Sequence, residues 1–133
     1  AMRESGGGAI LNIGSLASLK HGGGTGYTVS KTGIIALTKN VALAYAPDKI
    51  RCNAVCPGHV DTPFIRDDKE HSPNNWETTI ENPDNYQRRL NTIPLGRFQT
   101  PDDVAKAALF LCCEEASMIT GAVLNVDGGT SLV

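Results

Sequence analysis

The feature that most constrains the fold is an alternation of short apolar runs with segments of helical periodicity. Gly8–Ile13, Ile50–Cys56 and Ala122–Val126 are compact, largely apolar runs, which is typical of buried strands. Between them, Tyr27–Ala46 and Thr100–Cys113 repeat apolar residues at helical spacing. Strands that alternate with helices connect by right-handed crossovers, so this order predicts an α/β fold with a parallel sheet.

Local signals indicate where the helices begin and end. The broad apolar coverage of the first helix is typical of a largely buried helix, and Pro47 ends it. The second helix begins at Thr100-Pro-Asp-Asp103, where the threonine caps, the proline fits the first turn and the aspartates suit the positive end of the helix dipole. A shorter helix is expected near Asp84–Leu90.

The segment 61–91 is polar, contains three prolines and has weak periodicity. A long stretch of this kind inside a compact domain is usually functional, for example as a lid over a site. Its charges are mixed within one short run: Arg66, Asp67, Asp68, Lys69 and Glu70. The adjacent pair Arg88 and Arg89 is interpreted as a solvated helix face.

Composition limits the partners and the compartment. A chain of 133 residues suits one domain, and its net charge of -2 leaves no basic excess to neutralise the phosphates of a nucleic acid. No apolar stretch reaches the roughly 20 residues that a membrane helix needs. The start at Ala1-Met2-Arg3-Glu4 is not a secretory signal, so we expect a cytoplasmic protein without a membrane partner.

The cysteines and histidines do not form a metal-binding pattern. Cys52 and Cys56 fall on one face of a predicted strand and are interpreted as small core residues, whereas Cys112 and Cys113 are interpreted as the buried end of a helix. No two cysteines form a Cys-x-x-Cys pair, and the histidines have no metal-ligand spacing: His21, His59 and His71. We therefore expect neither a metal nor a structural disulfide.

Three polar residues at the start of the chain can form a catalytic site. Ser15 follows the first strand, Tyr27 opens the next helix, and Lys31 lies four residues further on, on the same helical face as the tyrosine. An ammonium near a phenol favours the phenolate, and such a phenol can exchange a proton with a substrate oxygen. Ligands of parallel α/β sheets gather at the carboxyl ends of strands, so these side chains and the turn 57–62 are expected in one site.

Several ordered motifs resemble those of the short-chain dehydrogenase/reductase family. Asn12-Ile-Gly-Ser15 is similar to its Asn-x-Ser-Ser motif, with Gly14 in place of the first serine, and Tyr27 and Lys31 match its Tyr-x-x-x-Lys. The stretch 53–62 resembles its Asn-x-x-x-Pro-Gly motif with the Thr that follows. Three further runs resemble its carboxy-terminal signature: 93–97, 100–104 and 119–129. The resemblance, from about Gly8 to Gly129, implies the carboxy-terminal half of a Rossmann-like domain, with about three parallel strands and flanking helices.

The resemblance implies an enzyme that moves a hydride between NAD or NADP and a carbonyl or alcohol substrate. It makes Tyr27 the general acid/base, Lys31 the residue that activates it and holds the nicotinamide ribose, and Ser15 the residue that orients the substrate oxygen. Ser18 is a weaker candidate for the serine role. A homo-oligomer, dimer or tetramer, is also implied.

Further positions follow from the same resemblance. The turn residues would hold the nicotinamide carboxamide and a nearby phosphate together with Tyr27 and Lys31: Pro57, Gly58, Val60 and Thr62. The segment 63–95 would form the substrate lid, and residues 1–133 would be one catalytic half-domain. Asp127 is interpreted as a turn residue before Gly-Gly. His59 is expected to point to solvent.

The sequence departs from the family pattern in one large respect. The family's glycine-rich cofactor loop and its Asn-Asn-Ala-Gly stretch belong to an amino-terminal half, and Gly6-Gly7-Gly8 precedes a strand instead of following one. The 133-residue chain alone is therefore expected to be inactive. The alternative is a truncated, non-catalytic homologue that acts as an oligomerising or regulatory module through its long helix. An epimerase or dehydratase of an extended relative is a third reading.

Overall fold

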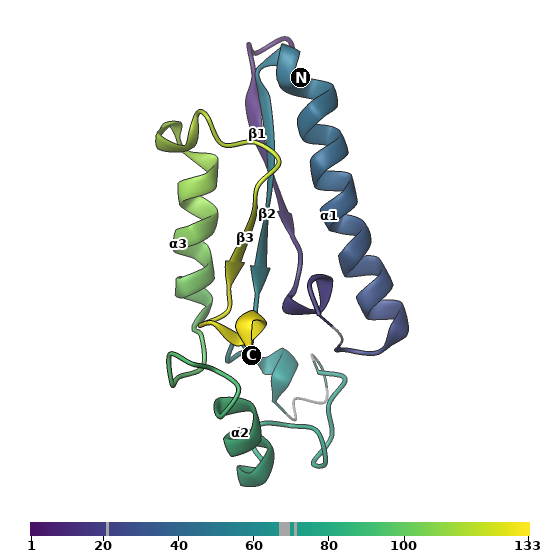
Figure 1. Ribbon diagram of the computed structural model, residues 1–133, viewed down its shortest axis with the longest axis vertical. Helices are drawn as coiled ribbons and strands as arrows, with labels where there is room; N and C mark the ends of the chain where they lie inside the picture. Colours follow the sequence, from purple (N-terminus) through teal and green to yellow (C-terminus); the bar gives the residue numbers. More distant parts are fainter. Residues whose placement is uncertain (21, 67–69, 71) are drawn as a thin grey trace.

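The computed structural model describes residues 1–20, 22–66, 70 and 72–133. Its sheet has three parallel strands in the order β1-β2-β3, formed by β1 (Gly8–Ile13), β2 (Ile50–Pro57) and β3 (Val123–Val126). All three strands point the same way, so their carboxyl ends lie at one edge of the sheet (Figure 1). The predicted parallel α/β half of a Rossmann-like sheet is confirmed, with each strand within one residue of its expected bounds.

Helices cover both faces of the sheet (Figure 1). The helix α1 (Thr25–Tyr45) lies on one face and α3 (Pro101–Cys112) on the other, which leaves β2 in the centre of the molecule. The third helix, α2 (Pro83–Leu90), lies beyond the carboxyl ends of the strands and confirms the short helix expected there. None of the helices in the described ranges is long and apolar enough to cross a bilayer.

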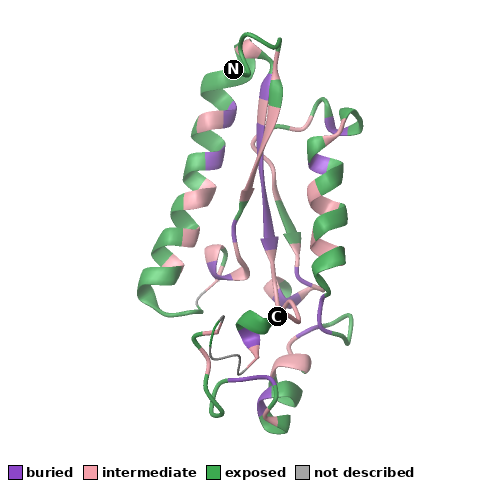
Figure 2. Cartoon of the chain, turned by 180° about the vertical axis from the view of Figure 1, so that it is seen from behind, coloured by how far each residue is buried: buried purple, intermediate pink, exposed green. Residues whose placement is uncertain are grey.

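The expectation that the first helix is largely buried is wrong. Among the described side chains of α1, only Thr38 and Ala42 are buried, whereas Leu37 is 54% and Leu43 is 82% exposed. Figure 2 shows the outer side of this helix as mostly exposed. A helix on a sheet buries one side only, and none of the described elements covers the other side of α1. Its apolar outer side is therefore open to solvent.

The central strand β2 forms the core under both helices. Cys52 and Cys56 are fully buried in it, which confirms their interpretation as small core residues. Cys112 is exposed and Cys113 is partly exposed, so their predicted burial is wrong. Leu111 occupies the buried position of the last turn of α3, and the next residue is rotated by about 100° around the helix, away from the sheet. All four cysteines are free.

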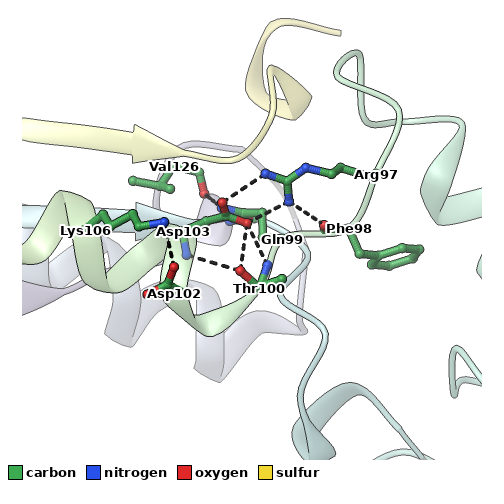
Figure 3. A network of polar contacts seen from close by, with 9 residues as sticks. Arg97, Phe98, Gln99, Thr100, Asp102, Asp103, Lys106 and Val126 are labelled. Atoms are coloured by element: carbon green, nitrogen blue, oxygen red, sulfur yellow. Dashed lines mark hydrogen bonds and ion pairs between the residues drawn. The ribbon is translucent and has the colours of Figure 1, made fainter.

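The start of α3 is held by a compact polar network (Figure 3). The Thr100 side chain accepts a hydrogen bond from the Asp103 backbone N–H at 3.3 Å, and the Asp103 carboxylate accepts one from the Thr100 N–H at 2.8 Å. Arg97 donates to both carboxylate oxygens of Asp103, at 2.7 and 2.9 Å. The predicted cap is therefore confirmed, and it fixes the point where the segment 63–95 joins the helix.

The segment 63–95 has a small apolar cluster of its own. Ile65, Ile80 and Ile93 are buried together with Phe98, and Leu90 packs against them. The helix α2 starts at the cap Asn82, whose side chain accepts a hydrogen bond from the Asp84 N–H at 3.0 Å. This cluster holds the described residues on either side of α2 together with Phe98.

Candidate active site

A cavity of about 850 Å³ is lined by residues that follow β1 and β2 and by described residues of the segment 63–95. Three residues predicted for the site, Ser15, Tyr27 and Gly58, line it. The other lining residues come from the loop after β1, the turn after β2, the segment 63–95 and the carboxyl terminus: Leu16, Ala17, Lys20, Gly22, Gly23, His59, Phe64, Ile65, Pro73, Asn74, Arg89, Thr92 and Thr130. Ser15 and Tyr27 therefore line the same partly enclosed space.

The loop after β1 determines the position of Ser15. Its hydroxyl accepts a hydrogen bond from the Ala17 N–H at 3.1 Å, and its own N–H donates to the Ser18 hydroxyl at 3.0 Å. The Ser18 hydroxyl in turn donates to the Lys31 carbonyl at 2.8 Å. Ser18 thus ties this loop to α1 and does not line the cavity, which leaves Ser15 as the better candidate of the two serines.

A steric contact explains why glycine is found at position 14, in place of the first serine of the family motif. A Cβ at Gly14 would lie 2.7 Å from the Cys56 sulfur and 3.3 Å from both the Ser18 hydroxyl and the Val55 carbonyl oxygen. Burial raises the pKa of the Cys56 thiol, which therefore packs here as a neutral group. The buried sulfur of β2 occupies the space that a side chain at position 14 would need.

Tyr27 and Lys31 lie at the start of α1, next to the end of β1. The Tyr27 ring rests on the backbone of Gly23, where a Cβ would lie 2.5 Å from the ring. The Lys31 ammonium lies 5.7 Å from the centroid of that ring and donates a hydrogen bond to the Ile13 carbonyl at 3.0 Å. The lysine therefore links the first turns of α1 to the last residue of β1 and keeps its charge beside the Tyr27 ring.

Gln99, which the sequence did not single out, holds the turn after β2. Its side-chain oxygen accepts a hydrogen bond from the Gly58 N–H at 2.8 Å, and its side-chain nitrogen donates to the Val126 carbonyl. Its backbone N–H donates to the His59 carbonyl at 3.0 Å. Gln99 thereby connects this turn to the end of β3. In the sequence, only its position directly before Thr100, the cap of α3, could have pointed to Gln99.

The other predicted residues of the turn lie beside the cavity. Pro57 ends β2, Val60 pairs with Gln99, and the Thr62 hydroxyl donates to the Val60 carbonyl at 3.4 Å. None of these residues lines the cavity, and neither does Lys31. The structure thus brings Ser15, Tyr27 and Gly58 into direct contact with the cavity, and the remaining predicted residues form its immediate surroundings.

The expectation that His59 points to solvent is wrong, and the interpretation of Arg88 and Arg89 as a solvated helix face holds for the exposed Arg88 but not for Arg89. His59 lines the cavity, with its ring centroid 6.3 Å from that of Phe98. Burial lowers the pKa of His59, and the charges of Arg89 and Lys20 lower it further. Arg89 also lines the cavity, since it lies one helical turn after the buried Asn85. That spacing could have identified it.

Asp127 is a turn residue, as predicted. Its two carboxylate oxygens accept hydrogen bonds from the Gly129 and Ser131 N–H groups, both at 2.9 Å. Within the described ranges, no group of three or more His, Cys, Asp or Glu side chains could hold a metal ion. Several residues named from the sequence lie outside the described residues: His21, Asp67, Asp68, Lys69 and His71.

The parallel sheet with helices on both faces defines a class, the Rossmann-like α/β proteins, and this one carries a serine after its first strand and a Tyr-x-x-x-Lys run in its first helix. A family model described as enoyl-(acyl carrier protein) reductase matches residues 1–131. The chain belongs to the short-chain dehydrogenase/reductase family.

Individual relatives agree with this family. The 4-formylbenzenesulfonate dehydrogenase of Comamonas testosteroni is 40% identical over 130 residues, which are 97% of this chain and 48% of that protein. The crystal structure of a short-chain dehydrogenase/reductase from Burkholderia thailandensis has a TM-score of 0.85 at 40% identity, over 99% of this chain and 48% of the other.

A crystal structure with bound NADP is described as a 2-deoxy-D-gluconate 3-dehydrogenase from Agrobacterium tumefaciens. It has a TM-score of 0.83 at 34% identity, over 99% of this chain and 50% of the other. The chain thus spans about half the length of the proteins that it matches.

Proposed function

We propose that the protein carrying this chain is an NAD- or NADP-dependent oxidoreductase that transfers a hydride between nicotinamide and a carbonyl or alcohol substrate. The observation that carries this proposal is the shared cavity of Ser15 and Tyr27, with the Lys31 ammonium beside the phenol ring. The family membership and the NADP-bound relative support it.

The donor groups around the cavity fit a nicotinamide riboside. Lys31 uses one of its three N–H donors on the Ile13 carbonyl, so two remain for ribose hydroxyls, which Tyr27 would also contact. The turn at Pro57, Gly58, Val60 and Thr62 would hold the carboxamide and a nearby phosphate. When bound, the nicotinamide supplies or accepts the hydride.

The chain's own residues handle the proton. The Tyr27 phenol gives its proton to the substrate oxygen during reduction and takes it back during oxidation, which is general acid–base catalysis. The Ser15 hydroxyl uses a lone pair to accept the Ala17 N–H, so its hydrogen is available to the same substrate oxygen. The Lys31 ammonium lies 5.7 Å from the centroid of the Tyr27 ring and would hold the nicotinamide ribose beside it. The segment 63–95 covers the substrate as a lid.

The direct test is an assay of the complete protein with NAD, NADP and panels of carbonyl and alcohol substrates. We expect turnover with at least one cofactor and one substrate class, followed at the absorbance of the reduced nicotinamide. Absence of turnover across both panels, in a protein that remains folded by circular dichroism, would overturn the proposed activity.

The exposed apolar side of α1 supports a second candidate, an oligomerising module without catalytic activity. Leu37, Leu43 and Val29 are more than half exposed on this helix, and a second copy of the chain could cover them. A titration with NADH and NADPH separates the two candidates. It follows the fluorescence of Trp76, which is 58% exposed in the segment 63–95. A complete protein that binds neither NADH nor NADPH in this titration, yet forms a dimer, would favour the module.

A further inference from the structure

The lining of the cavity carries positive charge. Three of its side chains are basic and come from different elements: Lys20 after β1, His59 after β2 and Arg89 in α2. The positive charge comes from Lys20 and Arg89. Among the described lining residues there is no carboxylate. Basic groups around a partly enclosed space produce a field that favours an anion inside it.

Of these three residues, Arg89 is the one best placed to bind a ligand. The Lys20 ammonium donates to the Thr130 and Val133 carbonyls at 3.2 and 2.7 Å, so it holds the carboxyl terminus. The lowered pKa of His59 keeps its imidazole neutral near pH 7. The Arg89 guanidinium donates to the Thr78 carbonyl at 2.8 Å, which uses one of its five N–H donors.

The surroundings of Arg89 disfavour its charge when the cavity holds no anion. Burial lowers the pKa of Arg89, and the neighbouring charge of Arg88 lowers it further. A carboxylate or sulfonate in the cavity would reverse this effect and form charge-assisted hydrogen bonds with the guanidinium fork. The site is therefore better suited to an anion than to a neutral group.

We propose that the substrate carries an oxyanion, a carboxylate or a sulfonate, that binds Arg89 while its carbonyl or alcohol carbon lies at Ser15 and Tyr27. This inference rests on the proposed function and names the substrate class of the same site. Arg89 acts as a specificity residue on the lid, opposite the catalytic residues of the sheet. The substrate then spans the cavity from α2 to the end of β1.

The apolar residues of the cavity lining indicate the chemistry of the rest of this substrate. The same cavity has apolar walls formed by Leu16, Ala17, Phe64, Ile65 and Pro73. Apolar walls with a few placed polar groups bind a hydrocarbon or aromatic body and fix its orientation. A short chain or one ring between the anion and the carbonyl fits this arrangement.

The test compares matched aldehydes in the complete protein. The anionic probes are 4-formylbenzoate, 4-formylbenzenesulfonate and 4-oxobutanoate, and the neutral probes are the methyl esters of the two carboxylates. We expect kcat/KM to favour the anionic members by about tenfold or more, as one charge-assisted contact provides. Arg89→Gln should remove this preference and leave the esters within about twofold. Unequal losses on the carboxylate and the sulfonate identify which oxyanion the site prefers.

Arg88→Gln is the matched control. Arg88 is the adjacent residue of α2, is exposed, and donates to the Asn85 side chain at 2.7 Å. The same substitution there should leave the preference for anions intact. Equal kcat/KM for anionic and neutral aldehydes, or an anion preference that survives Arg89→Gln, would overturn the inference while the oxidoreductase activity stands.

A binding measurement separates this inference from the proposed function. If no aldehyde is reduced with NADH or NADPH, the carbonyl-reducing activity fails, and calorimetry with benzoate, benzenesulfonate and neutral benzamide decides the anion site alone. Binding of an anion that Arg89→Gln abolishes supports the site. Absence of anion binding, or equal binding of benzamide, overturns it.

Discussion

At the scale of single residues, Tyr27 is the position where the proposed chemistry can be tested most directly. Tyr27 lines the cavity, and its ring rests on Gly23. Removal of the hydroxyl alone should therefore leave the packing of the ring intact. We expect Tyr27→Phe in the complete protein to lower kcat by about a hundredfold or more, because the general acid/base is lost.

Tyr45→Phe is the control for this substitution. Tyr45 lies at the other end of α1, is 38% exposed as Tyr27 is, and does not line the cavity. Its loss of a hydroxyl should leave kcat unchanged, and both variants should keep the wild-type melting temperature. The proton-transfer role is wrong if Tyr27→Phe retains the wild-type kcat.

Gly14 and Cys56 provide a second prediction at this scale. Gly14→Ala forces a Cβ into the 2.7 Å contact with the Cys56 sulfur, and we expect a loss of about 1–3 kcal/mol in the free energy of unfolding from overpacking. In the Cys56→Ala background this loss should become smaller, since only the 3.3 Å contacts remain. Denaturant unfolding of the two single variants and the double variant measures the coupling.

The control for these unfolding measurements is Gly33→Ala in α1. A Cβ at Gly33 meets no atom within 4 Å, and alanine favours a helix by about 1 kcal/mol over glycine. This variant should be as stable as the wild type or more stable. A coupling energy of zero between positions 14 and 56 would refute the steric explanation for the glycine.

At the scale of elements, the cap of α3 predicts a dependence of stability on pH. The hydrogen bond from Arg97 and the one from the Thr100 N–H hold the pKa of Asp103 well below its usual range. A carboxyl with a lowered folded-state pKa stabilises the fold above its unfolded pKa of about 4, and this stabilisation is lost as the pH falls towards the folded value.

We therefore expect Asp103→Asn to be less stable than the wild type at pH 7, with a difference that shrinks steadily below about pH 4. Asp102→Asn is the control, because Asp102 lies in the same turn but is 70% exposed and pairs only with Lys106 at 2.6 Å. Melting temperatures across pH 3–7 measure both. A difference for Asp103→Asn that does not change with pH would contradict the ion-pair explanation.

At the scale of the whole molecule, the chain spans about half the length of the proteins that it matches. β1 pairs only with β2 among the described strands, so its other edge is open. The adenosine part of the cofactor has no recognisable glycine-rich loop in the sequence. We expect the purified 133-residue chain to show no dehydrogenase activity with NAD or NADP. Turnover by this chain alone, at a rate comparable to that of the complete protein, would disprove this expectation.

The sequence by itself determined the elements and their order. The cap at Thr100, the stop at Pro47 and the apolar run of β2 are local signals, because a few neighbouring residues decide backbone geometry and burial there. The motif order likewise indicated Ser15, Tyr27 and Lys31 as one group.

Only the tertiary structure decided what surrounds that group. Gln99 bonds to the turn after β2, and Arg89 and His59 line the cavity, since α2 lies beyond the carboxyl ends of the strands. Those contacts join residues distant in sequence, and no periodicity encodes them. The exposed side of α1 has the same origin, because apolar spacing predicts a face for packing but not whether this chain supplies a partner.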